Sequence, residues 1–97
     1  MNKGKAEIND PTLLVDINEA TLAVKEQRFA DALKILEINL SRYPDHTDSL
    51  YLAAVSARYL KKFDDSKKYI ETLLIKAADM GRAYQELGHL NKASGND

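Results

Sequence analysis

This chain of 97 residues resembles itself at a fixed step of 34 positions, and such a period constrains a chain to fold as a repeat. Segment 29–36 aligns with segment 63–70, so that an aromatic residue, a small residue and an aliphatic residue coincide. The same step pairs three further positions: Tyr84 with Leu50, Leu87 with Ala53 and Gly88 with Ala54. The spacing predicts two complete units, 13–46 and 47–80, and a partial third unit over 81–97.

Each unit is predicted to contain two helices, because its apolar residues recur at helical spacing. In the first unit, Asp10 is a suitable N-cap and Pro11 a suitable first helical residue. Segment 26–28 forms a tight corner, and Phe29 opens the second helix. Pro44 ends that helix, since proline cannot continue the hydrogen-bond ladder.

The second and third units repeat this scheme. Thr47 or Asp48 is expected to cap the first helix of unit two, and Asp64 the second. In the partial unit, Arg82 is expected to begin a helix that reaches about Ala93, and segment 94–97 forms another corner. No run alternates with period two between turn residues, so the predicted fold class is all-α.

Small residues are expected where two antiparallel helices cross at roughly 8–10 Å, because large facing side chains would hold them apart. Five positions of the repeat carry such residues: Ala20, Ala32, Ala54, Ser66 and Gly88. Larger residues, among them Phe29, Phe63 and Tyr69, would fill the space between hairpins. One hairpin cannot bury its apolar face alone, so each needs its neighbour.

The pattern resembles the tetratricopeptide repeat. Unit one supplies Ala20, Phe29, Ala32, Leu36 and Pro44; unit two supplies Leu50, Ala53, Ala54, Phe63, Ile70 and Leu73; unit three supplies Tyr84, Leu87, Gly88 and Gly95. The sequence departs from the family pattern at Asp16, Ser66 and Ala78. The resemblance implies antiparallel hairpins stacked as a right-handed superhelix, with two full repeats and the first helix of a third over 11–97.

A narrower resemblance concerns segments 50–60 and 81–90, which are similar to the N-terminal repeats of bacterial tetratricopeptide-containing sulfotransferases. In that family the helical array precedes a catalytic domain that uses a sulfonucleotide donor. This sequence contains no part of such a domain, and it stops after the first helix of a repeat. We therefore expect a fragment of a longer protein.

Composition excludes several functions. The formal net charge of −1 gives no global support for binding nucleic acid or an anionic membrane. The chain has no cysteine, so disulfides and zinc–cysteine sites are excluded. Segment 1–10, which we expect to be flexible, leads into no apolar signal region, and no stretch approaches the roughly 20 apolar residues of a membrane span. These features predict a cytoplasmic location.

The first helix of each unit should line the inner surface of the stack, and this surface is the candidate partner groove. Its predicted residues are Ile17, Thr21, Val24, Tyr51, Val55, Arg58, Tyr59, Arg82, Gln85 and His89, with Leu14, Lys25, Asp48 and Lys92 beside them. Aromatic and arginine side chains are typical binding anchors. The alternative is that Tyr51 and Tyr59 pack between neighbouring helices.

One tetratricopeptide subclass holds a peptide's terminal carboxylate with a basic and asparagine clamp. The clamp positions fall on Ile17, Thr21, Leu52, Arg82 and Glu86. Only Arg82 has suitable chemistry, and Glu86 would repel a carboxylate. The sequence therefore argues against the clamp.

Other candidate sites have simpler interpretations. His46 lies in a turn without the paired histidines of a metal site, and His89 has no nucleophile motif near it. Acidic residues interleave with the lysines at 61, 62, 67, 68 and 76, as on a solvated helix face. We predict no catalytic residue, no cofactor and no metal.

Three functions from different classes remain. The leading hypothesis is a non-catalytic module that holds a protein or peptide in the groove, where replacing Tyr51 and Arg58 together should abolish capture without loss of helicity. The second is the non-catalytic head of a sulfotransferase-like enzyme. The third is homo-oligomerisation through the exposed side of Tyr84, Leu87 and Leu90 on the last helix.

Overall fold

The computed structural model describes the backbone of residues 11–95 and the side chains of residues 16–95. Over these residues the chain forms helices and no strand: α2 (Pro11–Lys25), α3 (Phe29–Arg42), α4 (Thr47–Tyr59), α5 (Phe63–Lys76) and α6 (Gly81–Ser94). The all-α prediction is confirmed for this part of the chain. The predictions for segment 1–10, including the Asp10 cap, and for the side chain of Leu14 lie outside the described residues.

The backbone repeats itself at the same step as the sequence. The corner residues Gln27 and Lys61 both have a positive φ, 63° and 64°. The residues that precede α3 and α5, Arg28 and Lys62, share a ψ of 68° and 69°. Both corners also use the same bonds, since the amide of Arg28 donates to Ala23 at 2.7 Å and that of Lys62 to Ala57 at 2.8 Å. The two hairpins are therefore closed by one local geometry.

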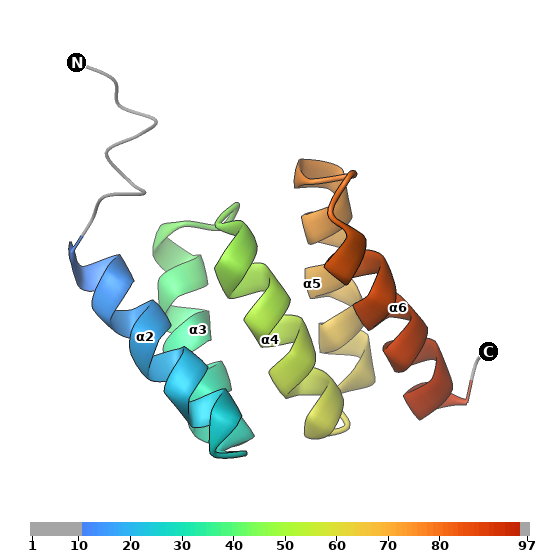
Figure 1. The fold of residues 1–97 in the computed structure, drawn as a ribbon, viewed down its shortest axis with the longest axis horizontal. Helices are drawn as coiled ribbons and strands as arrows, with labels where there is room; N and C mark the ends of the chain where they lie inside the picture. Colours follow the sequence, from blue (N-terminus) through green and yellow to red (C-terminus); the bar gives the residue numbers. More distant parts are fainter. Residues whose placement is uncertain (1–10, 96–97) are drawn as a thin grey trace.

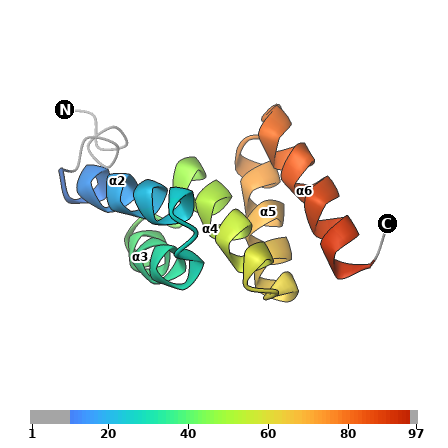
Figure 2. The same cartoon turned by 60° about the horizontal axis from the view of Figure 1, so that its bottom comes forward.

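The helices pack in chain order and form two layers. Each helix contacts the next one, and α4 also contacts both α2 and α6. Among the described residues, no Cα atom of α3 lies within 8 Å of a Cα atom of α5. Figures 1 and 2 show α2, α4 and α6 side by side, with α3 and α5 on the other side of this three-helix layer. The layer of α2, α4 and α6 is therefore the more closely packed of the two.

The core follows the repeat. Among the described residues, six pairs of positions separated by one repeat step are fully buried: Ala20 and Ala54, Ala23 and Ala57, Ala32 and Ser66, Leu36 and Ile70, Asn39 and Leu73, and Ser49 and Ala83. Alanine and serine at these crossings let the helices approach closely, as the sequence predicted. At one crossing the Ser66 hydroxyl donates to the carbonyl oxygen of Ala54 at 2.8 Å, which satisfies a buried polar group.

Gly88 does not share this role, and that prediction was wrong. It is not buried on α6, and a methyl group added to it would meet nothing within 4 Å. Ala54, the equivalent residue of α4, is buried in a cluster that includes Ile70 of α5. No helix of the described residues covers α6 on that side, so the position needs no small residue there.

The predicted helix starts also need correction. His46, rather than Thr47 or Asp48, caps α4, because its ring nitrogen accepts the amide proton of Ser49. Helix α5 begins at Phe63 without a side-chain cap, so Asp64 lies in its first turn instead of capping it. Helix α6 begins at Gly81, just before the predicted start. In the part of the chain that the structure describes, no helix is long and apolar enough to cross a membrane.

Candidate partner groove

Two neighbouring hollows lie along the layer of α2, α4 and α6, and Tyr51 lines both. The first hollow, of about 210 Å³, is lined by Ile17, Thr21, Asp48, Tyr51, Leu52 and Arg82. The second hollow, of about 340 Å³, is lined by Val24, Lys25, Gln27, Phe29, Tyr51, Val55, Arg58, Tyr59, Glu86 and His89. Of the predicted groove residues, Gln85 lines neither hollow, and neither does Lys92, which was expected beside them. We refer to the two hollows together as the groove.

Arg82 and Asp48 form one wall of the first hollow. The Arg82 guanidinium donates to Asp48 Oδ1 at 2.7 Å and lies over the Tyr51 ring, 4.4 Å from its centroid. The two charged side chains come from equivalent turns of α6 and α4, 34 residues apart. Their pairing joins neighbouring helices of the inner layer. It also means that Arg82, the one clamp position with suitable chemistry, already has a carboxylate partner within the chain.

Arg58 and Glu86 form a buried ion pair at the base of the second hollow. The guanidinium donates from Nε to Glu86 Oε2 and from a terminal nitrogen to Oε1 at 3.3 Å. The Glu86 side chain is 2% exposed and that of Arg58 is 15% exposed. Burial lowers the pKa of Arg58, but the hydrogen bond and charge of Glu86, with a smaller effect of Tyr59, outweigh it and raise the pKa overall. The Arg58 guanidinium therefore keeps its charge beside the Glu86 carboxylate.

This pair changes the interpretation of Glu86. From the sequence, the Glu86 carboxylate was expected to repel an anionic ligand. Its partner Arg58 is 28 residues away in the chain, and the sequence pattern did not indicate that the two side chains would meet. In the fold, α4 and α6 bring Arg58 beside it. Glu86 therefore joins two helices and presents little charge to the groove.

Aromatic rings form the far end of the groove. The Phe29 and Tyr59 rings stack with their centroids 4.4 Å apart and their planes 4° from parallel. The Arg58 guanidinium lies 4.5 Å from the centroid of the Tyr59 ring. Tyr59 is nevertheless 55% exposed. It thus packs against the first residue of α3, as one of the alternatives from sequence expects, while part of its side chain faces solvent.

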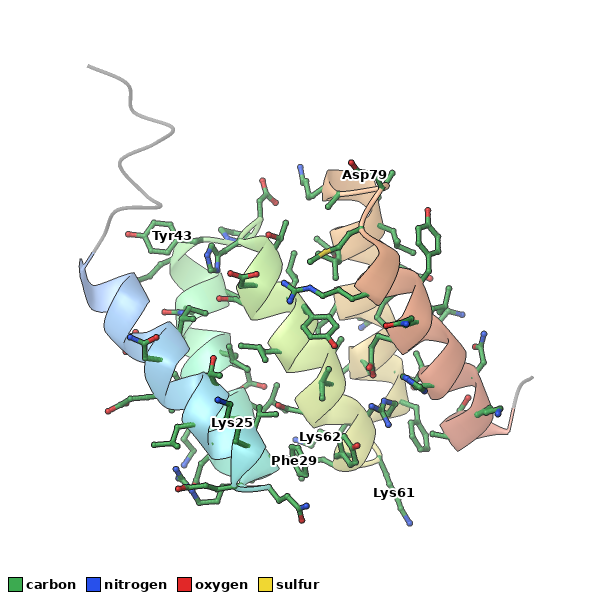
Figure 3. The ribbon with its side chains drawn as sticks, viewed as in Figure 1. Lys25, Phe29, Tyr43, Lys61, Lys62 and Asp79 are labelled. Carbon is green, nitrogen blue, oxygen red and sulfur yellow. The ribbon has the colours of Figure 1, made fainter. Side chains whose placement is uncertain are left out.

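Beside the Gln27 amide, which also has no partner in the described residues, Lys25 and His89 supply polar groups to the second hollow. Both are exposed, and neither makes an ion pair or a hydrogen bond through its side chain in the described part of the chain. Lys25 is the last residue of α2, and Figure 3 shows it close to Phe29 at this end of the molecule. Once Arg58 and Glu86 cancel, Lys25 leaves the second hollow with a net positive charge.

The groove predicted from sequence left out four lining residues, Gln27, Phe29, Leu52 and Glu86, although the last two were considered as clamp positions. Gln27 and Phe29 belong to the corner between α2 and α3, and they reach the groove because the corner closes its end. Leu52 and Glu86 occupy equivalent positions of α4 and α6, one repeat step apart. The repeat was the signal that could have assigned this pair to the inner face together.

His46 lies in the turn before α4, where it is half-buried and contacts two buried polar residues, Asn39 and Ser49, through a chain of hydrogen bonds. The Asn39 amide donates to Ser49 Oγ at 3.4 Å, and this hydroxyl lies 2.8 Å from His46 Nδ1. Because Nδ1 also accepts the backbone proton of Ser49, the hydroxyl is the donor to the ring. The serine is fully buried and inaccessible to a substrate, so this contact caps a helix and is no nucleophile–base pair.

The described residues contain no group of three or more histidine, cysteine, aspartate or glutamate side chains that could hold a metal ion. Comparisons with protein-family models, with curated proteins and with solved structures find no match to this chain.

Proposed function

We propose that the chain is a protein-interaction module of the tetratricopeptide-repeat type, which holds an extended peptide segment of its partner in the groove. The observation that carries this proposal is the groove itself. Two hollows that share Tyr51 follow the inner layer and expose an aromatic ring, Tyr59, at one end. Aromatic side chains in concave sites are common binding anchors.

The repeated backbone supports the assignment to this type. Corner dihedral angles and hydrogen bonds recur at the repeat step. In the described residues the backbones of the inner helices approach within 8 Å between Cα atoms, whereas those of α3 and α5 do not. A stack whose one layer is packed more tightly than the other curves toward the tighter layer. Curvature of this kind gives repeat proteins their concave binding surfaces.

Two threonines provide a matched test of the groove. Thr21 lines the first hollow, whereas Thr72 lies on α5, away from both hollows. Neither is fully buried, and each hydroxyl donates to the carbonyl one helical turn before it, at 2.8 and 3.0 Å. Thr21→Trp should fill the first hollow, while Thr72→Trp makes the same chemical change elsewhere.

The experiment selects random dodecapeptides on the immobilised chain and then measures each recovered peptide by fluorescence polarisation. We expect Thr21→Trp to weaken binding at least about tenfold, which is a loss of about 1.4 kcal/mol, and Thr72→Trp to leave it nearly unchanged. Circular dichroism checks that both variants fold. Recovery of no peptide, or of peptides that bind both variants equally, would refute the proposal.

Self-association through α6 is a second candidate function. Tyr84 is 52% exposed, as predicted for an uncovered helix side, and Gly88, predicted at a helix crossing, has open space beside it. Leu90, however, is buried in a cluster with Ala54 of α4 and Ile70 of α5, so the expected apolar surface is smaller than the sequence suggested. Sedimentation over a concentration series should show dimers that Tyr84→Glu dissociates; a monomer at every concentration would exclude this function.

A further inference from the structure

The charges of the groove point to one class of peptide. Two of its acidic side chains, Asp48 and Glu86, are already paired with Arg82 and Arg58. These pairs link α4 to α6, so a ligand would have to break helix contacts to use them. What remains for a ligand is the set of lining groups without partners.

In the second hollow that set is the Lys25 ammonium, the His89 ring and the Gln27 amide, so its one formal charge is positive. Lys25 projects from the end of α2 and His89 from α6, so the two side chains face the hollow from its opposite sides. The Lys25 ammonium donates three hydrogen bonds, and the His89 ring donates one in its neutral form. Among the described residues, neither side chain forms an ion pair with a carboxylate of the chain. A carboxylate is the complement of such an arrangement.

The first hollow has a different lining. Ile17 and Leu52 supply aliphatic surface, and the Tyr51 ring separates this hollow from the second. Its two charges are paired with each other. An aliphatic side chain can therefore enter it without leaving a polar group unpaired.

We propose that the groove binds an extended peptide segment that places an aliphatic side chain in the first hollow and a glutamate or aspartate side chain in the second. This inference rests on the proposed function and adds the chemistry of its ligand. The acidic side chain lies between the Lys25 ammonium and the His89 ring. The peptide backbone passes Tyr51, the residue common to both hollows.

The test uses the dodecapeptides selected on the wild-type chain. Their sequences should be enriched in acidic residues that accompany an aliphatic residue at a fixed spacing. Lys25→Glu and His89→Glu, singly and together, should weaken a representative fluorescein-labelled peptide, the double variant by at least about tenfold. Lys67→Glu makes the same charge change as Lys25→Glu on the exposed side of α5 and should have little effect.

A charge exchange separates recognition from damage to the fold. Replacing the peptide's acidic residue with lysine should abolish binding to the wild-type chain and restore it to the Lys25→Glu chain. Selected peptides that lack acidic residues, or that bind equally well to Lys25→Glu and Lys67→Glu, would overturn this inference. If those peptides still lose affinity for Thr21→Trp, the proposed function stands; if they do not, both fail.

Discussion

Removal of Arg58 should destabilise the fold far more than removal of a surface arginine. In Arg58→Ala the Glu86 carboxylate, 2% exposed, would remain buried without a counter-charge. Breaking a buried pair in this way costs about 3–5 kcal/mol. A small domain has a total stability of about 5–15 kcal/mol, so the variant should lose a large share of it.

The loss is measurable by heat or denaturant. Each kcal/mol shifts the Tm of a domain of this size by about 4–8 °C, so Arg58→Ala should unfold at least about 12 °C below the wild type. Urea titration followed by circular dichroism gives the free energy directly. Arg28→Ala serves as the control, because Arg28 is 47% exposed and its ion pairs with Glu26 and Asp31 lie at the surface. That variant should unfold close to the wild type.

A double variant tests the physical cause. Arg58→Met with Glu86→Leu removes both charges and fills the space with apolar atoms, and such replacements are often neutral or stabilising. The double variant should therefore be more stable than Arg58→Ala by at least about 2 kcal/mol, since it leaves no isolated carboxylate. If Arg58→Ala costs less than about 1 kcal/mol, as an exposed pair does, the argument from burial fails.

Three further changes test the local physics by the same unfolding assay. Gly88→Ala should stabilise the fold by about 0.5–1 kcal/mol, since a methyl group meets no neighbour there and alanine favours helix; destabilisation would reveal a contact at this position. Lys61→Val should cost about 1–2 kcal/mol relative to Lys61→Gly, because the positive φ strains a β-branched residue; equal stabilities would refute that strain. Burial first, and then the charges of Glu37 and Asp65, raise the pKa of Tyr69 in the folded chain above its ordinary value of about 10. Below about pH 10 Tyr69 holds its proton in both the folded and the unfolded chain, so the free energy of unfolding does not change. Above about pH 10 the unfolded chain ionises first, so the stability of the wild type should fall relative to Tyr69→Phe as pH rises through the folded pKa. An unchanged difference between the two proteins from about pH 9 to about pH 11 would contradict this.

The 34-residue period of the sequence predicted much of the fold, because the same packing requirement at each helix crossing sets the residue type at each repeat. A residue that must be small where helices cross is small in each hairpin, as Ala32 and Ser66 show. The groove could be projected for the same reason, since the inner face recurs at each step. Most of its predicted residues do line the hollows.

Features that depend on a single atom or on a missing neighbour could not be predicted in this way. Thr47 and Asp48 are the usual types of capping residue, yet the ring nitrogen of His46 accepts the free amide instead. Gln27 and Lys61 adopt the left-handed conformation that usually indicates glycine. Gly88 occupies the position equivalent to Ala54 in the repeat. Ala54 is covered by a helix and Gly88 is not, and the repeat pattern alone does not indicate which positions a neighbouring helix covers.

The ion pairs also decide which residues can report on binding. Tyr51 and Arg58 are the obvious choices from sequence, because an aromatic and an arginine at the centre of a groove are typical anchors. In the fold, Arg58 neutralises a buried carboxylate, so its removal should cost stability and helicity along with any affinity. Thr21, Lys25 and His89 make no hydrogen bond or ion pair to another helix through their side chains in the described residues. Substitutions at these positions therefore address the ligand without removing a helix-to-helix bond.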